Sequence, residues 1–89
     1  MLTLPAVLTQ AQAGACLSTQ LAALRGETGA EVQVDASKLD QFDSSALAVL
    51  LEFRRETQAV GKRFVVHGVP LRLKNLAALY GVADLLQPA

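Results

Sequence analysis

Hydrophobic residues along the chain recur with two periods, one typical of strands and one typical of helices. Residues 2–8 alternate loosely and include Pro5, which lacks a backbone donor, so they predict a strand at the edge of a sheet. Between residues 13 and 24 apolar positions lie three and four apart, which predicts an amphipathic helix followed by Gly26. Residues 31–36 alternate strictly, which predicts a second strand with one apolar face. That face consists of Val32, Val34 and Ala36.

The second half of the chain again alternates between helix patterns and strand patterns. Residues 46–60 are rich in strong helix formers, and Gly61 is placed to end that helix. Residues 63–69 are apolar on both sides of the alternation, which predicts a strand inside the sheet with both faces covered. Pro70 suits the first turn of a third helix that ends before Gly81. The stripes expected to pack on the sheet are Ala46, Val49, Leu50, Phe53, Thr57 and Val60 in the second helix, and Leu73, Leu76, Ala77 and Tyr80 in the third.

The order strand, helix, strand, helix, strand, helix predicts an α/β fold with a mostly parallel sheet and helices packed on it. The chain has 89 residues, of which 52% are hydrophobic and 18% are charged. This length is sufficient for one compact domain, so we expect a single domain over residues 1–89.

Charge and cysteine content narrow the classes of partner. Eight basic and eight acidic side chains give a formal net charge of zero, so the general attraction to nucleic acid or anionic membranes is absent. The single cysteine, Cys16, lies on the apolar stripe of the first helix and is interpreted as a small buried hydrophobe. The first ten residues do not resemble a signal peptide, and no apolar stretch is long enough to span a bilayer. We therefore expect a cytoplasmic protein that reaches a membrane only through a partner.

The chain offers no recognisable set of catalytic or cofactor-binding groups. One histidine, one cysteine and scattered carboxylates lack metal-ligand spacing, so no metal is expected. Gly26 and Gly29 precede a predicted strand rather than a helix, which is the wrong context for a phosphate-binding turn. His67 has no evident nucleophile to activate and is interpreted as a histidine hydrogen-bonded at the sheet margin. We expect no enzymatic activity and no cofactor, and a surface that recognises other proteins.

The most informative segment directly precedes the second predicted helix and contains Phe42, Asp43, Ser44 and Ser45. Its hydroxyls lie at a helix N-terminus, where free N–H groups and partial positive charge would also receive a phosphate on Ser44. The alternative is ordinary capping, in which Asp43 or Ser44 accepts a hydrogen bond from the first turn. Residue types leave both interpretations open.

Leu47 and Leu51 lie beside the apolar stripe of the second helix, on a flank that continues to Arg54 and Arg55. If exposed, the leucines would form an apolar patch with a charged rim next to Ser44, as expected for a protein interface. If buried, they would extend the core. The pattern leaves these alternatives open as well.

Residues 34–51 resemble the strand, loop and second helix of the STAS domain family. Members carry an Asp, a Ser or Thr, a small residue that is usually Gly, and a Leu at the start of that helix. The segment from Asp43 to Leu47 matches, with Ala46 in place of the glycine. The similarity continues through residues 67–69 and 76–86, where it is strongest to STAS subunits of ABC-type phospholipid transporters. The acidic-glycine turn common after the first strand of the family is replaced by residues 6–10.

The resemblance implies a non-enzymatic accessory subunit that binds the cytoplasmic ATPase of such a transporter, in a system that maintains outer-membrane lipid asymmetry. Ser44, flanked by Asp43 and Ser45, would lie on the docking surface. The expected partner-binding residues are Phe42, Asp43, Ser44, Ser45, Leu47 and Leu51.

The alternative implied by the same family is an anti-sigma factor antagonist switched by phosphorylation of Ser44, the hydroxyl position that is phosphorylated in those proteins. A phosphate there would add about −1.5 to −2 charges to the interface. The chain stops at Gln87-Pro88-Ala89 without the longer final helix usual in antagonists, which favours the transporter subunit.

Overall fold

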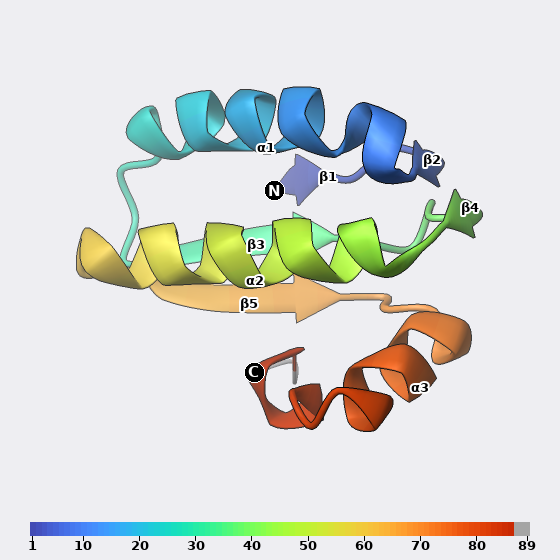
Figure 1. Cartoon of the computed structure of the whole chain (residues 1–89). Helices are drawn as coiled ribbons and strands as arrows, with labels where there is room; N and C mark the ends of the chain where they lie inside the picture. Colours follow the sequence, from blue (N-terminus) through green and yellow to red (C-terminus); the bar gives the residue numbers. More distant parts are fainter. Residues whose placement is uncertain (87–89) are drawn as a thin grey trace.

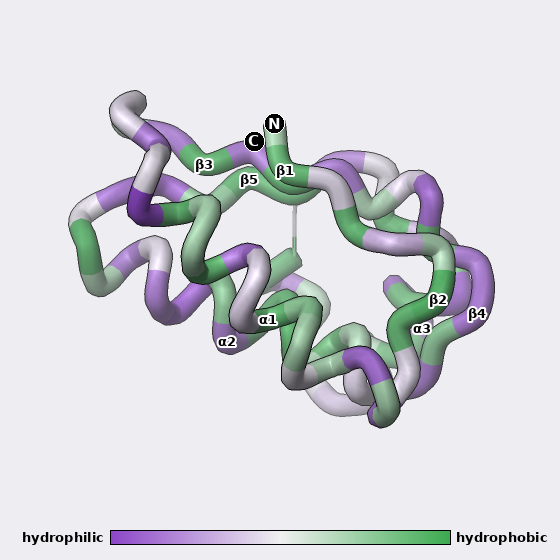
Figure 2. Tube along the Cα trace, turned by 90° about the horizontal axis from the view of Figure 1, so that it is seen from above, coloured by the Kyte–Doolittle hydropathy of each residue, from purple (hydrophilic) through white to green (hydrophobic). Residues whose placement is uncertain are grey.

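The computed structural model describes residues 1–86 and shows an α/β domain (Figure 1). Residues 87–89, on which the distinction between a transporter subunit and an antagonist was based, lie outside the described residues. Seen from above, α1 and α2 lie on the same side of the strands β1, β3 and β5 (Figure 2). The elements are β1 (Leu2–Thr3), β2 (Val7–Leu8), α1 (Gln10–Arg25), β3 (Glu31–Asp35), β4 (Gln41–Phe42), α2 (Ser44–Ala59), β5 (Arg63–His67), α3 (Leu71–Leu79) and the 3-10 helix η1 (Ala83–Leu86).

The strands form a three-stranded parallel sheet in the order β1-β3-β5 and a separate parallel pair, β2-β4. Val34 of β3 lies opposite Leu2 of β1 and Val66 of β5. The parallel sheet with an edge N-terminal strand is therefore confirmed.

Two strand predictions are wrong. Residues 2–8 form two strands rather than one, since the chain is interrupted around Pro5 and continues to a different partner. β5 is an edge strand, because β1 occupies the other side of β3. The burial of both Val65 and Val66 shows that the centre of β5 is covered on both faces, which does not require a central position in the ladder.

Most of the predicted core is confirmed. Leu76 is only partly buried against the core, and Val60 and Tyr80 are exceptions, because each is 59% exposed instead of packed on the sheet. Each residue directly follows the last residue of its helix, Ala59 in α2 and Leu79 in α3, so helical periodicity no longer determines where its side chain points. The predicted positions that are buried are Val32, Val34, Ala36, Ala46, Val49, Leu50, Phe53, Thr57, Leu73 and Ala77.

The helix ends follow local sequence signals. α1 begins at Gln10, three residues earlier than predicted, because Thr9 is its N-cap and the Gln12 side chain forms a capping box with Thr9. Gln12 Oε1 accepts hydrogen bonds from the Thr9 N–H at 2.9 Å and the Thr9 hydroxyl at 2.6 Å. Thr9-x-x-Gln12 is a helix-start pattern readable in the sequence. Gly61 has φ +80° just beyond α2, as its predicted terminating role requires.

The chain segments at the carboxyl ends of β3 and β5 are held together by hydrogen bonds. The Ala36 N–H donates to the His67 carbonyl at 2.8 Å, and His67 Nε2 lies 3.1 Å from Gln33 Oε1, which confirms a histidine hydrogen-bonded at the sheet margin. Gly68 follows with φ +69°, and a Cβ there would lie 2.8 Å from the Ser37 Cβ. Only glycine fits this contact without displacement, and the contact directs the chain into α3 beside the loop that follows β3.

Candidate functional site

The candidate site lies at the carboxyl ends of the parallel strands. Figure 1 shows β2, β4 and the N-termini of α1, α2 and α3 gathered at the end toward which β3 and β5 point. Residues 36–43 cross this end and lead directly into α2. The N–H groups of Asp40 and Gln41 both donate to the Ala6 carbonyl, at 2.8 and 2.9 Å. This crossing segment, residues 36–43, is thereby fixed on the side of β2.

The Asp43 carboxylate contacts the N-termini of two helices. One oxygen, Oδ1, accepts from the Ser45 N–H at 2.8 Å and caps α2, and Oδ2 accepts from the Gln10 N–H at the start of α1 at 3.3 Å. The hydrogen bond from the Ser45 N–H is the main cause that holds the pKa of Asp43 below its ordinary value. Asp43 therefore aligns α1 and α2 beside the candidate site.

Asp43→Asn is expected to flatten the acid limb of the stability profile. Because the folded pKa of Asp43 is lowered, its charge stabilises the native state above the ordinary value of 3.8, and this contribution is lost as pH falls through the folded pKa. Urea unfolding of both chains between pH 7 and pH 2.5 measures the effect. The matched control is Asp40→Asn, an exposed aspartate that caps no helix. Equal pH profiles for wild type and Asp43→Asn would contradict the assignment.

Ser44 is the first residue of α2 and is exposed, while Asp43 is the cap. Of the capping alternatives, the structure therefore selects Asp43. Phe42 and Ser45 on either side are partly buried. The Ser44 side chain is thus presented to solvent at the N-terminus of a rigid helix.

Leu47 does not belong to the exposed surface. Its side chain is 4% exposed and is part of the core, so the alternative of burial is correct for this leucine. The physical reason is helical geometry: Leu47 lies about 60° around α2 from Ser44, on the flank opposite the α1-facing residues Ser45 and Glu52. α3 packs against α2 and adds cover that the sequence did not reveal.

Leu51 lies on the same side of α2 as Ser44, seven residues away and therefore only about 20° around the helix. It is partly buried, whereas Ala48 between them is exposed. Arg55 extends this side but is already paired with Glu52 and Glu56. We call Ser44, Ala48 and Leu51 the Ser44 stripe.

Arg72 of α3 is a residue of this site that the sequence did not indicate. Its Nη2 donates to the Asp40 carbonyl at 3.1 Å, and its guanidinium carbon lies 4.3 Å from the centre of the Phe42 ring. These residues are about 30 positions apart in sequence, and no local pattern links them. Only the packing of α3 brings the arginine to the crossing segment.

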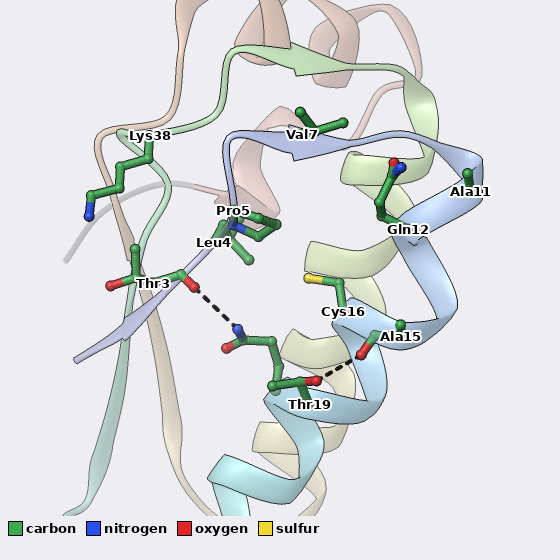
Figure 3. Close-up of a pocket in the computed structure, with 11 residues that line it drawn as sticks. Thr3, Leu4, Pro5, Val7, Ala11, Gln12, Ala15, Cys16, Thr19 and Lys38 are labelled. Carbon is green, nitrogen blue, oxygen red and sulfur yellow. Dashed lines mark hydrogen bonds between the residues drawn. The ribbon is translucent and has the colours of Figure 1, made fainter.

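A groove of about 620 Å³ lies on another side of α1, between this helix and the segment from Thr3 to Val7 (Figure 3). The Cys16 sulfur points into this space, and partial burial raises the pKa of its thiol. Because Cys16 is only partly buried, its interpretation as a small buried hydrophobe is correct only in part. Gln20 is buried; its Nε2 donates to the Thr3 carbonyl at 3.4 Å, and its Oε1 has no hydrogen-bond partner. The remaining groove residues are mostly aliphatic and form no catalytic arrangement.

Within residues 1–86, no three potential metal-ligating side chains of His, Cys, Asp or Glu cluster together. None of the helices described is both long and apolar enough to cross a bilayer. The site itself consists of exposed hydrogen-bonding groups, the N-terminus of α2 and the Ser44 stripe.

Parallel strands with helix N-termini gathered at one end, and a serine opening α2, match the STAS class of regulatory and accessory domains. A family model described as "Mlab, STAS domain" matches residues 1–87, and the chain belongs to this family. A search of curated proteins found no match. The predicted STAS family is confirmed, and the description of the matching model places the chain with MlaB, the STAS subunit type that the sequence was found to resemble most.

Proposed function

We propose that the chain is a non-enzymatic accessory subunit that docks on the ATPase of an Mla-type ABC phospholipid transporter. In this proposal it lies in the cytoplasm, reaches the inner membrane through the ATPase, and supports a system that maintains outer-membrane lipid asymmetry. The observation that carries the proposal is the match of residues 1–87 to the "Mlab, STAS domain" family.

The proposed docking surface consists of the Ser44 stripe and the preceding turn. Ser44 is exposed on a helix that Asp43 caps and connects to α1. A rigid helix end presents its polar groups with little loss of conformational freedom on binding, which favours affinity. Leu51 would supply apolar contact, and Leu47 is removed from the set of direct contacts because it is buried.

Ser44→Glu is expected to weaken the complex with the transporter ATPase at least tenfold while the free chain stays folded. The added carboxylate is compatible with a helix N-terminus but places bulk and charge in the proposed contact. Ser44→Thr retains the hydroxyl and is expected to bind within about threefold of wild type. Calorimetric titration of the purified ATPase subunit measures affinity, and circular dichroism measures folding.

The matched control is Ser18→Glu, which adds the same charge at an exposed serine of α1. Unchanged affinity for Ser44→Glu, or an equal loss for Ser18→Glu, would reject the Ser44 surface. Absence of any complex between the wild-type chain and the ATPase at micromolar concentration would reject the proposed function itself.

The exposure of Ser44 also favours a second candidate, the anti-sigma factor antagonist switched by phosphorylation. The two functions differ in their partners. A chain that captures an anti-sigma factor kinase and becomes phosphorylated on Ser44 by it is an antagonist. A chain that copurifies with the permease and ATPase of a transporter is its accessory subunit.

A further inference from the structure

We propose that Arg72 is a second docking residue beside Ser44, where its guanidinium receives a carboxylate of the partner ATPase. The proposal rests on the docking function above and adds the chemistry of one partner group.

Two contacts hold the Arg72 head group on the crossing segment. Nη2 donates to the Asp40 carbonyl at 3.1 Å, and the guanidinium carbon lies 4.3 Å from the centre of the Phe42 ring. Stacking on an aromatic face orients a planar guanidinium and preserves its charge. An arginine held in this way loses less conformational freedom when a partner binds than a freely moving lysine does.

These contacts place the cation over the side chain of Phe42, in the turn that leads to Ser44. Phe42 precedes Ser44 by two residues, so their Cα atoms are separated by at most about 7.6 Å. The close approach of Gly68 to Ser37 independently fixes the chain that leads into α3 against the same segment. The position of Arg72 therefore follows from the fold as well as from its own side-chain contacts.

The charge of Arg72 is available to a partner. A guanidinium has five N–H donors, and the described contacts use one of them for the Asp40 carbonyl. Arg55 is paired with Glu52 and Glu56, and Arg63 is paired with Glu31. Among residues 1–86, no carboxylate forms such an ion pair with Arg72, which is exposed.

A carboxylate is the group that the remaining donors fit best, because two parallel N–H groups can bind its two oxygens. The arginine would then combine an aromatic stack within this chain with an ion pair across the interface. Arginine in such a position is enriched among residues that dominate binding affinity.

Two substitutions separate the charge of Arg72 from its structural contacts. Arg72→Gln removes the charge but keeps an amide that can donate to Asp40, and Arg72→Lys keeps the charge. The matched control is Lys74→Gln, which removes an exposed cation from the same helix. Affinity for the purified ATPase subunit is measured at 50 and 300 mM salt. Hydrogen exchange of the Gln41 and Ser45 amides in the free chain reports whether the crossing segment and the cap are intact.

We expect Arg72→Gln to weaken binding about tenfold at low salt and less at high salt, because an interfacial ion pair is screened. Arg72→Lys keeps the charge but loses the planar pair of donors, so its binding is expected to lie between those of wild type and Arg72→Gln, and Lys74→Gln is expected to bind as wild type. The two amides should exchange at wild-type rates in all variants.

Three results would overturn the proposal. Unchanged binding by Arg72→Gln, with binding still lost in Ser44→Glu, would reject Arg72 and leave the docking surface intact. Equal losses in the Gln and Lys variants together with faster exchange of both amides would mean that Arg72 only holds the crossing segment. Unchanged binding by Ser44→Glu as well would show that the proposed docking surface itself is wrong.

Discussion

Gly68→Ala is expected to destabilise the fold by about 2–5 kcal/mol, the sum of a left-handed backbone and a steric overlap. Gly68 has φ +69°, and an added Cβ would lie 2.8 Å from Ser37 Cβ and 3.1 Å from Ser37 Cα. Since the second neighbour is backbone, rotation of a side chain cannot relieve the overlap. Urea unfolding monitored by circular dichroism measures the change in free energy of unfolding.

Other glycines of the chain provide matched controls. Gly61 and Gly81 also have positive φ, +80° and +73°, but a Cβ at either position meets nothing within 4 Å. Alanine at these positions is expected to cost only the backbone contribution of about 1–2 kcal/mol. Ser37→Gly should partly rescue Gly68→Ala by removing the nearest contact atom. If Gly68→Ala costs no more than Gly61→Ala, the close approach to Ser37 is not significant in solution.

Leu47→Ala is expected mainly to lower the stability of the free chain, and Leu51→Ala is expected mainly to weaken the complex with the ATPase. Leu47 is 4% exposed, so its truncation should cost about 2–5 kcal/mol of the free energy of unfolding through lost burial and a cavity. Leu51 is partly buried on the side of α2 that carries Ser44, so its truncation should cost less stability and weaken the ATPase complex. Thermal unfolding of the free chains and titration of the partner measure the two quantities.

Gln58→Gly controls for a general loss of α2 stability, because it acts through helix propensity at an exposed position of α2 outside the Ser44 stripe. A complex weakened equally by Gln58→Gly and Leu51→Ala would indicate that helix stability controls binding. A free Leu47→Ala chain as stable as wild type would contradict the assignment of Leu47 to the core.

The two leucines also show what helical periodicity in the sequence does not predict, which is the width of the buried face of α2. A single helix pattern predicts which side of α2 packs on a sheet, and Val49, Leu50 and Phe53 are buried as expected. How wide the buried arc becomes depends on which neighbours flank the helix. α1 lies along one flank of α2, and α3 also packs against α2. Leu47 is therefore buried although it lies beside the predicted stripe.

The sequence by itself determined the three α-helices, the strands β3 and β5, the parallel α/β class and the STAS family, because these follow from short-range signals. Period-two alternation placed Val32, Val34 and Ala36 on one buried face, and the capping residues before Ala46 located the start of α2 to within two residues. Helix starts and strand faces depend on residues a few positions apart. The same is true of the motif at residues 43–47.

Only the tertiary structure decided which segments far apart in the chain meet. It placed β5 at the sheet edge, gave Asp43 a second contact at Gln10, and brought Arg72 onto Phe42. The physical reason is that these contacts depend on the relative placement of whole elements, which is set by the summed packing of the core and by close approaches such as Gly68 to Ser37. No residue type or local spacing encodes that placement on its own.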